Sequence, residues 1–139
     1  MIDLTTKSGA RAAERLRNEL ILRLTTVTPN GQPQTSPVWF LWVDDEILLF
    51  SRANTPRPGN IRANSHVAAN FDSDGDVGDV VSIEGEARIT LETTAAADVP
   101  PACVEKHAAK LAAYGWTMAS MLVDSPVEIR IRPTRVRAR

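Results

Sequence analysis

The chain has 139 residues, a length that one hydrophobic core can organise, and its 43% hydrophobic and 24% charged residues are ordinary for a globular protein. No apolar run approaches the roughly 18 residues of a membrane span, and no basic segment with an apolar core opens the chain. We therefore expect a single domain over residues 1–139, located in the cytoplasm. The net charge of −1 conceals a polarised sequence, because residues 1–129 hold 11 basic and 17 acidic side chains and residues 130–139 hold five arginines and no acid.

Few of the residues that common metal and catalytic sites need are present. The single cysteine, Cys103, cannot form an internal disulfide, and with two histidines, His66 and His107, the sequence has no ligand cluster at zinc spacing. It also lacks a Gly-rich phosphate loop of the nucleotide-binding types and a Gly-x-Ser-x-Gly motif. We expect no metal. The acidic bulk of the chain, and the lack of aromatic residues among its last arginines, also argue against a nucleic-acid partner.

In chain order, the first predicted element is an amphipathic helix over residues 8–20, where Ala12, Leu16 and Leu20 recur at helical spacing. From Leu20 to Leu91, short apolar runs alternate with turn residues, which is typical of consecutive antiparallel strands. The expected strands cover residues 20–28, 33–43, 47–51, 66–71 and 79–91, with a helical turn at residues 60–64.

The strand expected at residues 33–43 differs from the others, because its segment Pro37–Val43 is apolar on both faces. A strand that is buried on both sides lies between a core and a second body, such as a covering helix, a partner subunit or a flat cofactor. This segment is therefore the first candidate for a functional surface.

A helical region is predicted over residues 95–122, with Pro100-Pro101 at a helix start and Gly115 as a stop. The last predicted strand covers residues 127–132 and should end or bulge at Pro133, where the alternation of apolar and charged residues changes phase. The sum is six strands with flanking helices, and a small closed barrel is the economical way to remove exposed sheet edges.

This order of elements carries motifs that together resemble the pyridoxamine-phosphate-oxidase-like split β-barrel flavoproteins. The similarity is greatest to short actinobacterial members that depend on a deazaflavin, coenzyme F-420, and it extends over most of the chain. The motifs are Leu24-Thr25-Thr26-Val27, Asn30-Gly31-Gln32-Pro33, the run Ser36 to Trp42, the spaced set Ser51, Thr55, Arg57 and Asn60-Ile61, the run Val80 to Ala87, and the closing Pro133 to Arg137.

The resemblance implies a mainly β fold with flanking helices, a six-stranded antiparallel split β-barrel of the FMN-binding type. It also implies a homodimer with two cofactor sites at the subunit interface. The cofactor ring would border Ser36, Pro37 and Val38 on the second strand.

The loop after the third strand suits the anionic tail of such a cofactor, because cationic and hydroxyl donors stand there beside a helix start. Arg52 and Arg57 supply charge in this loop. By the resemblance, Ser51, Thr55 and Asn60 match the tail-binding positions, Arg57 stands where lysine is usual, and Gly59 stands where arginine is usual.

We therefore predict a deazaflavin-dependent oxidoreductase that transfers a hydride to a small unsaturated or conjugated substrate. One alternative is an FMN-binding oxidoreductase of the same fold, and another is a non-catalytic protein that binds a flavin, haem or tetrapyrrole. The sequence identifies no catalytic residue. Trp39, Trp42, Trp116 and His107 are expected to serve packing, and the C-terminal arginines either meet the cofactor tail or balance the acidic body of the chain.

Overall fold

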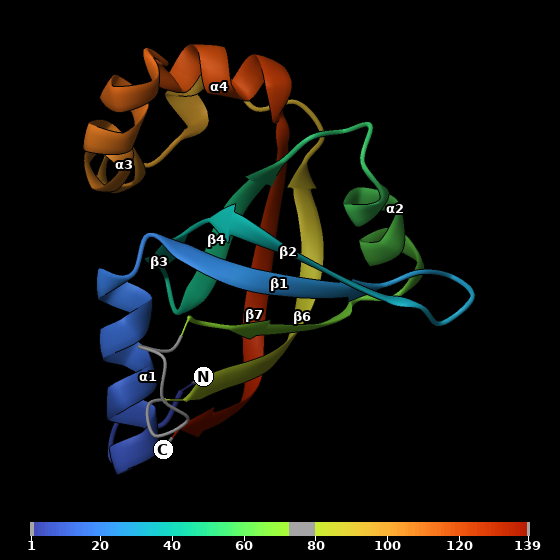
Figure 1. Cartoon of the computed structure of the whole chain (residues 1–139), viewed down its shortest axis with the longest axis vertical. Helices are drawn as coiled ribbons and strands as arrows, with labels where there is room; N and C mark the ends of the chain where they lie inside the picture. Colours follow the sequence, from blue (N-terminus) through green and yellow to red (C-terminus); the bar gives the residue numbers. More distant parts are fainter. Residues whose placement is uncertain (1, 73–79, 139) are drawn as a thin grey trace.

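The computed structural model describes residues 2–72 and 80–138, and within them the chain forms one antiparallel sheet of seven strands (Figure 1). The order across the sheet is β2-β1-β5-β6-β7-β4-β3, so β2 and β3 are its edges. The strands are β1 Ile21–Val27, β2 Pro33–Trp39, β3 Leu41–Val43, β4 Glu46–Ser51, β5 His66–Asn70, β6 Val81–Leu91 and β7 Val127–Ala138. Among the described residues, hydrogen bonds do not join the two edges, so the expectation of a closed barrel is wrong and the barrel is split between β2 and β3.

Helices flank this sheet, as the sequence predicted. They are α1 Lys7–Asn18, α2 Pro56–Ala63, α3 Pro101–Tyr114 and α4 Met118–Asp124, with a 3-10 turn, η1, at Ala96–Asp98. Figure 1 shows α3 and α4 together at the top of the molecule, α1 at the lower left and α2 at the side. None of the described helices is both long and apolar enough to cross a membrane.

Several boundaries follow from single residues. Gly115 ends α3 in the left-handed conformation, with φ of 71°, and so divides the predicted helical region into two helices. Helix α2 begins at Pro56, earlier than predicted, because a proline at the first helical position already has the required φ. Strand β5 ends at Asn70. The start predicted for the following strand, at residue 79, lies outside the described residues.

The prediction of one strand over residues 33–43 is wrong, because Phe40 interrupts it. β2 before the break pairs with β1, and β3 after it pairs with β4. The carbonyl of Phe40 leaves the sheet and accepts hydrogen bonds from Lys106 Nζ at 3.1 Å and His107 Nε2 at 2.9 Å. The chain thus turns a corner from one sheet edge to the other, and for this reason seven strands replace the predicted six.

Two apolar clusters lie on opposite faces of the sheet and share β4 as a wall. Ile47 and Leu49 belong to the cluster inside the barrel, while Leu48 belongs to a second cluster against α3 and α4. Leu41, which follows the corner, also joins the second cluster. The doubly apolar segment of the sequence therefore serves two cores, with helices as the covering body on its outer face.

Strands β6 and β7 contain the predicted bulge at Pro133. Glu84 pairs with Arg135 while Gly85 pairs with Pro133, so the intervening residue of β7 has no opposite partner. The strand continues beyond the bulge to Ala138, further than predicted. On the exposed face, Arg137 Nη1 lies 2.9 Å from Glu84 Oε2, and Arg132 pairs with Glu86. These contacts show two of the C-terminal arginines balancing acids of β6.

We predict that Gly85→Ala destabilises the barrel, because the added Cβ would lie 2.8 Å from Ile131 Cγ2 and 2.9 Å from the Arg132 carbonyl oxygen. The expected loss is about 1–3 kcal/mol in the free energy of unfolding, measured by urea denaturation. Gly59→Ala is the matched control. Its Cβ would meet no atom within 4 Å, and the helical position should gain up to about 1 kcal/mol. Equal midpoints for the two variants would contradict the packing argument.

Candidate functional site

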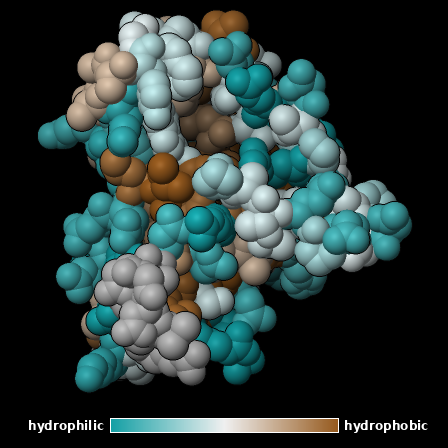
Figure 2. Space-filling model, in the orientation of Figure 1, coloured by the Kyte–Doolittle hydropathy of each residue, from teal (hydrophilic) through white to brown (hydrophobic). Residues whose placement is uncertain are grey.

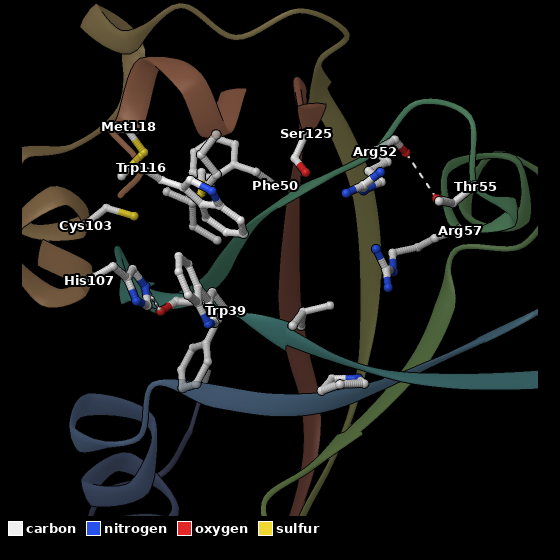
Figure 3. A pocket seen from close by; sticks show the side chains of 15 residues that line it. Trp39, Phe50, Arg52, Thr55, Arg57, Cys103, His107, Trp116, Met118 and Ser125 are labelled. Atoms are coloured by element: carbon white, nitrogen blue, oxygen red, sulfur yellow. Dashed lines mark hydrogen bonds between the residues drawn. The ribbon is translucent and has the colours of Figure 1, made fainter. Parts of the chain in front are cut away.

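A cavity of about 330 Å³ lies between the barrel and the helices α3 and α4. Figure 2 shows apolar surface in the hollow between these two parts of the molecule. The strands contribute Pro37, Val38, Trp39, Leu48 and Phe50, and the corner contributes Phe40. The loop before α2 contributes Arg52 and Thr55, and the first turn of α2 contributes Arg57. The helical end, which consists of α3, α4 and the residues next to them, contributes Cys103, His107, Trp116, Met118, Met121 and Ser125. Figure 3 shows the arginines and the aromatic side chains on opposite sides of this space, so the cavity has a cationic end and an aromatic end.

Arg57 is the central group of the cationic end. Its Nη1 donates to Ser51 Oγ at 3.0 Å and its Nη2 donates to Ser36 Oγ. The guanidinium is partly buried, and desolvation lowers its pKa. Among the described residues, no carboxylate lies within ion-pair distance of Arg57 or of Arg52. A half-buried cation that only neutral hydroxyls hold is stabilised further by an anion.

The start of α2 adds fewer donors to this end than most helix starts would. Pro56 and Pro58 occupy two positions of the first turn and have no N–H group. Thr55 Oγ1 donates to the Arg52 carbonyl at 3.1 Å, so this hydroxyl holds the loop. Side chains, above all Arg57, therefore provide most of the attraction for an anion.

Strand β2 forms the floor between the two ends. It is a sheet edge, so one side of its backbone has no neighbouring strand among the described residues. Pro37 is exposed here, in keeping with the preference of proline for edge strands, and Val38 is buried beneath it. A flat ring system could lie along this edge.

The aromatic end is a stack built on Trp39. The rings of Trp39 and His107 are parallel within 7° at 5.3 Å between centroids, and Trp116 lies 6.4 Å from Trp39 on a tilted plane. Tyr114 completes the group at 4.9 Å from Trp116. Trp42, by contrast, packs against the core of the barrel. Of the three tryptophans expected to serve packing, two thus also line the cavity.

His107 is buried and neutral in this stack. Its Nε2 must carry the proton, because Phe40 offers a carbonyl acceptor at 2.9 Å. Its Nδ1 is buried and has no hydrogen-bond partner within residues 2–72 and 80–138. Desolvation lowers the pKa of His107, the hydrogen bond to Phe40 raises it in part, and the charge of Lys106 lowers it again.

Cys103 is a second buried titratable group at the aromatic end. Burial raises its pKa to about 11, so the thiol is protonated and unreactive at neutral pH. Lys106 adds a cation next to this end but points to the Phe40 carbonyl and lies 3.9 Å from the Phe40 ring centroid. Burial lowers its pKa to about 8.

The sequence of the chain matches the pyridoxamine 5'-phosphate oxidase family over residues 9–139. The chain belongs to this family. No protein with a curated function matches it in sequence. The split-barrel fold expected from the resemblance is therefore that of its family, with the seven strands described above.

Three solved structures illustrate the fold. An F420 reductase is 23% identical with a TM-score of 0.68, covering 89% of this chain and 94% of its own. A conserved hypothetical protein from Mycobacterium tuberculosis is 24% identical with a TM-score of 0.74, covering 96% of this chain and 84% of its own. A heme storage protein from Vibrio cholerae is 12% identical with a TM-score of 0.62, covering 96% of this chain and 95% of its own. At these identities the likeness concerns the fold alone.

The structure brings most of the predicted cofactor residues of this family member together. Pro37, Val38, Arg52, Thr55 and Arg57 line the cavity, and the hydroxyls of Ser36 and Ser51 hold Arg57. Asn60, by contrast, does not line the cavity. It is buried, and its Nδ2 donates to Thr26 Oγ1 at 3.0 Å and to Gln34 Oε1 at 2.9 Å, so its amide ties α2 to β1 and β2.

Sequence reasoning missed the contribution of the helical end. Trp116, Met118 and Met121 line the cavity together with His107 and Cys103. A signal was present, because Cys103, His107 and Leu111 recur every four residues and mark the buried face of α3. Nothing in that pattern distinguishes a helix over a core from a helix over a cavity. Among the described residues, no group of three or more potential metal ligands occurs.

We predict that His107 makes the stability of this protein depend on pH. The unfolded chain takes up a proton near pH 6.5, the ordinary histidine value, whereas the folded chain resists protonation because burial lowers the pKa of His107. The free energy of unfolding should therefore fall as the pH drops below about 6.5. His107→Gln should flatten this decline, since the amide nitrogen can donate to the Phe40 carbonyl and does not titrate. Thermal melting across the pH range measures the effect, and an unchanged slope in the variant would contradict it.

Proposed function

We propose that the chain is an oxidoreductase that uses a deazaflavin, coenzyme F420, to reduce a small unsaturated or conjugated substrate. The observation that carries this proposal is one cavity that joins Arg57, which has no carboxylate partner in residues 2–72 and 80–138, to an aromatic wall. A cofactor with an anionic tail and a flat ring is complementary to the cationic end and to the β2 edge beside it, which leaves the aromatic wall for the substrate. The family and the similarity in fold to an F420 reductase support the same class of chemistry.

The residues present fit such a cofactor. Arg57, held by Ser36 and Ser51, would bind the phosphate of the tail, and the more exposed Arg52 would attract its outer charges. The edge of β2 at Pro37 and Val38 would orient the ring, while the apolar helical end would exclude water. When bound, the deazaflavin supplies the hydride, and the chain supplies orientation and electrostatics.

The charge of the cationic end favours a deazaflavin over FMN. A phosphate monoester carries nearly two negative charges at neutral pH, whereas the phosphodiester in the tail of F420 carries one. At the phosphate position, one half-buried guanidinium beside a helix start with two prolines suits the single charge of a phosphodiester, and the exposed Arg52 is left for the charges further along the F420 tail. FMN remains the alternative implied by the resemblance to FMN-binding split barrels.

A haem-binding function has less support from the cavity. Haem iron needs an axial ligand such as a free imidazole or a thiolate. The Nε2 atom of His107 is hydrogen-bonded to Phe40, its Nδ1 atom is buried and so out of reach of a haem in the cavity, and the Cys103 thiol has a raised pKa of about 11. His66, the other histidine, lies on the exposed end of β5 and does not line this cavity.

We predict that Arg57→Gln weakens the binding of F420 about 10- to 100-fold, the value of one or two charge-assisted hydrogen bonds. Titration of the purified protein with F420, followed by tryptophan fluorescence, measures this. Arg62→Gln is the matched control, since Arg62 lies on the same helix but pairs with Glu92 at 2.8 Å outside the cavity. Tight binding of FMN with no response to F420 would overturn the choice of cofactor, and equal affinities in both variants would overturn the site.

We also propose that the active form is a homodimer with the cofactor sites at the subunit interface. Large apolar side chains are exposed around the helical end, including Tyr114 at 56%, Trp116 at 50% and Val123 at 81% exposure. Such a concentration on a small chain suits an interface. Light scattering after size exclusion should therefore give twice the mass of 15.2 kDa. The proposal would be contradicted if the protein remained a monomer in solution and still bound the cofactor.

A further inference from the structure

The aromatic end of the cavity has a chemical character of its own. It consists of Trp39, Phe50, Trp116 and the two methionines Met118 and Met121, with Cys103 and His107 behind them. Cys103 is a neutral thiol and His107 a neutral imidazole at pH 7, by the burial described above. No carboxylate or cation lines this end within the described part of the chain. A charged ligand placed there would lose its hydration without gaining a partner.

Trp116 stands at this end because the backbone fixes it there. Gly115 takes the left-handed conformation, and the N–H of Trp116 donates to the Leu111 carbonyl at 2.8 Å, which closes the end of α3. The next residue, Thr117, caps α4 by accepting from the N–H of Ser120 at 3.1 Å. Two adjacent helix caps thus hold a half-exposed indole beside the cavity.

We propose that this aromatic end is a separate subsite for an uncharged, planar ring of the substrate, and that Trp39 and Trp116 determine its specificity. The inference rests on the proposed function in one respect, that the ligand is a substrate rather than another small molecule. The tilt of 52° between the two indoles offers a flat ring both stacked and edge contacts. Met118 and Met121 can adapt to its substituents, because methionine is flexible.

The experiment uses three probes of similar size and the full chain without cofactor. 2-Naphthol is planar and uncharged, decahydro-2-naphthol is uncharged but not planar, and 2-naphthoate is planar but anionic. Calorimetry should show 2-naphthol binding at least about tenfold more tightly than either comparator, as the loss of stacking or the desolvation of a charge predicts.

Variants locate the binding. Trp116→Leu should weaken 2-naphthol binding about tenfold, while Trp42→Leu, on the barrel core and outside this cavity, should leave it within a factor of about two. A second measurement needs no substitution. The three indole N–H signals of the wild-type chain report separately in NMR, and 2-naphthol should shift those of Trp39 and Trp116 but not that of Trp42.

Equal affinity for the three probes, or unchanged binding in Trp116→Leu, would overturn the proposal. The proposal would also be overturned if 2-naphthoate bound more tightly than 2-naphthol and Arg57→Gln abolished that binding. In that case the carboxylate of the probe would bind at the cationic end and would determine where the ring lies. The outcome is independent of the cofactor. If 2-naphthol binds as expected but F420 and FMN do not, the subsite stands and the proposed function fails. If F420 binds but the three probes bind with equal affinity, the proposed function stands and the subsite fails.

Discussion

The carbonyl group of Phe40 is the point on which the arrangement of this protein depends. A backbone acceptor that leaves a sheet inside the protein must find another donor, and here Lys106 and His107 of α3 supply two. The same contact lets the chain pass from one sheet edge to the other and places α3 over the outer face of β4. The same contacts therefore fix both the corner of the barrel and the position of α3 beside the cavity. A change that removed these donors would affect both.

The cavity follows from how the strands beside this corner divide their faces. β4 gives Ile47 and Leu49 to the barrel and Leu48 and Phe50 to the helical side. Because the helices meet only part of that outer face, a hollow remains between them and β2. Its two ends differ because different segments reach them. The loop before α2 and the first turn of α2 bring the guanidinium groups of Arg52 and Arg57, while the turn between α3 and α4 brings the indole of Trp116 next to Trp39 of β2.

The strands and helices were largely predictable because their signals are local. The alternation along β6, the proline at the start of α3 and the left-handed glycine at its end each act within a few residues. The corner at Phe40 was not predictable, since nothing in an unbroken apolar run marks where a carbonyl will find donors 66 and 67 residues away. Asn60 illustrates the same limit at the site. A motif places it beside Arg57, but its amide is engaged by Thr26 and Gln34, from strands that no local pattern connects to α2.

The position of β7 has a consequence for how the chain is made. This strand follows all the others in the sequence, yet it lies between β6 and β4 near the middle of the sheet. Before β7 has been synthesised, β4 and β6 therefore each have one edge without a neighbouring strand, and Glu84 and Glu86 of β6 lack the arginines with which they later pair. Sheets whose central pairing is so distant in sequence fold slowly. Until residues 127–138 have been made, the free edges of β4 and β6 are open to pairing with another chain, and the like charges of Glu84 and Glu86 on β6 oppose such pairing.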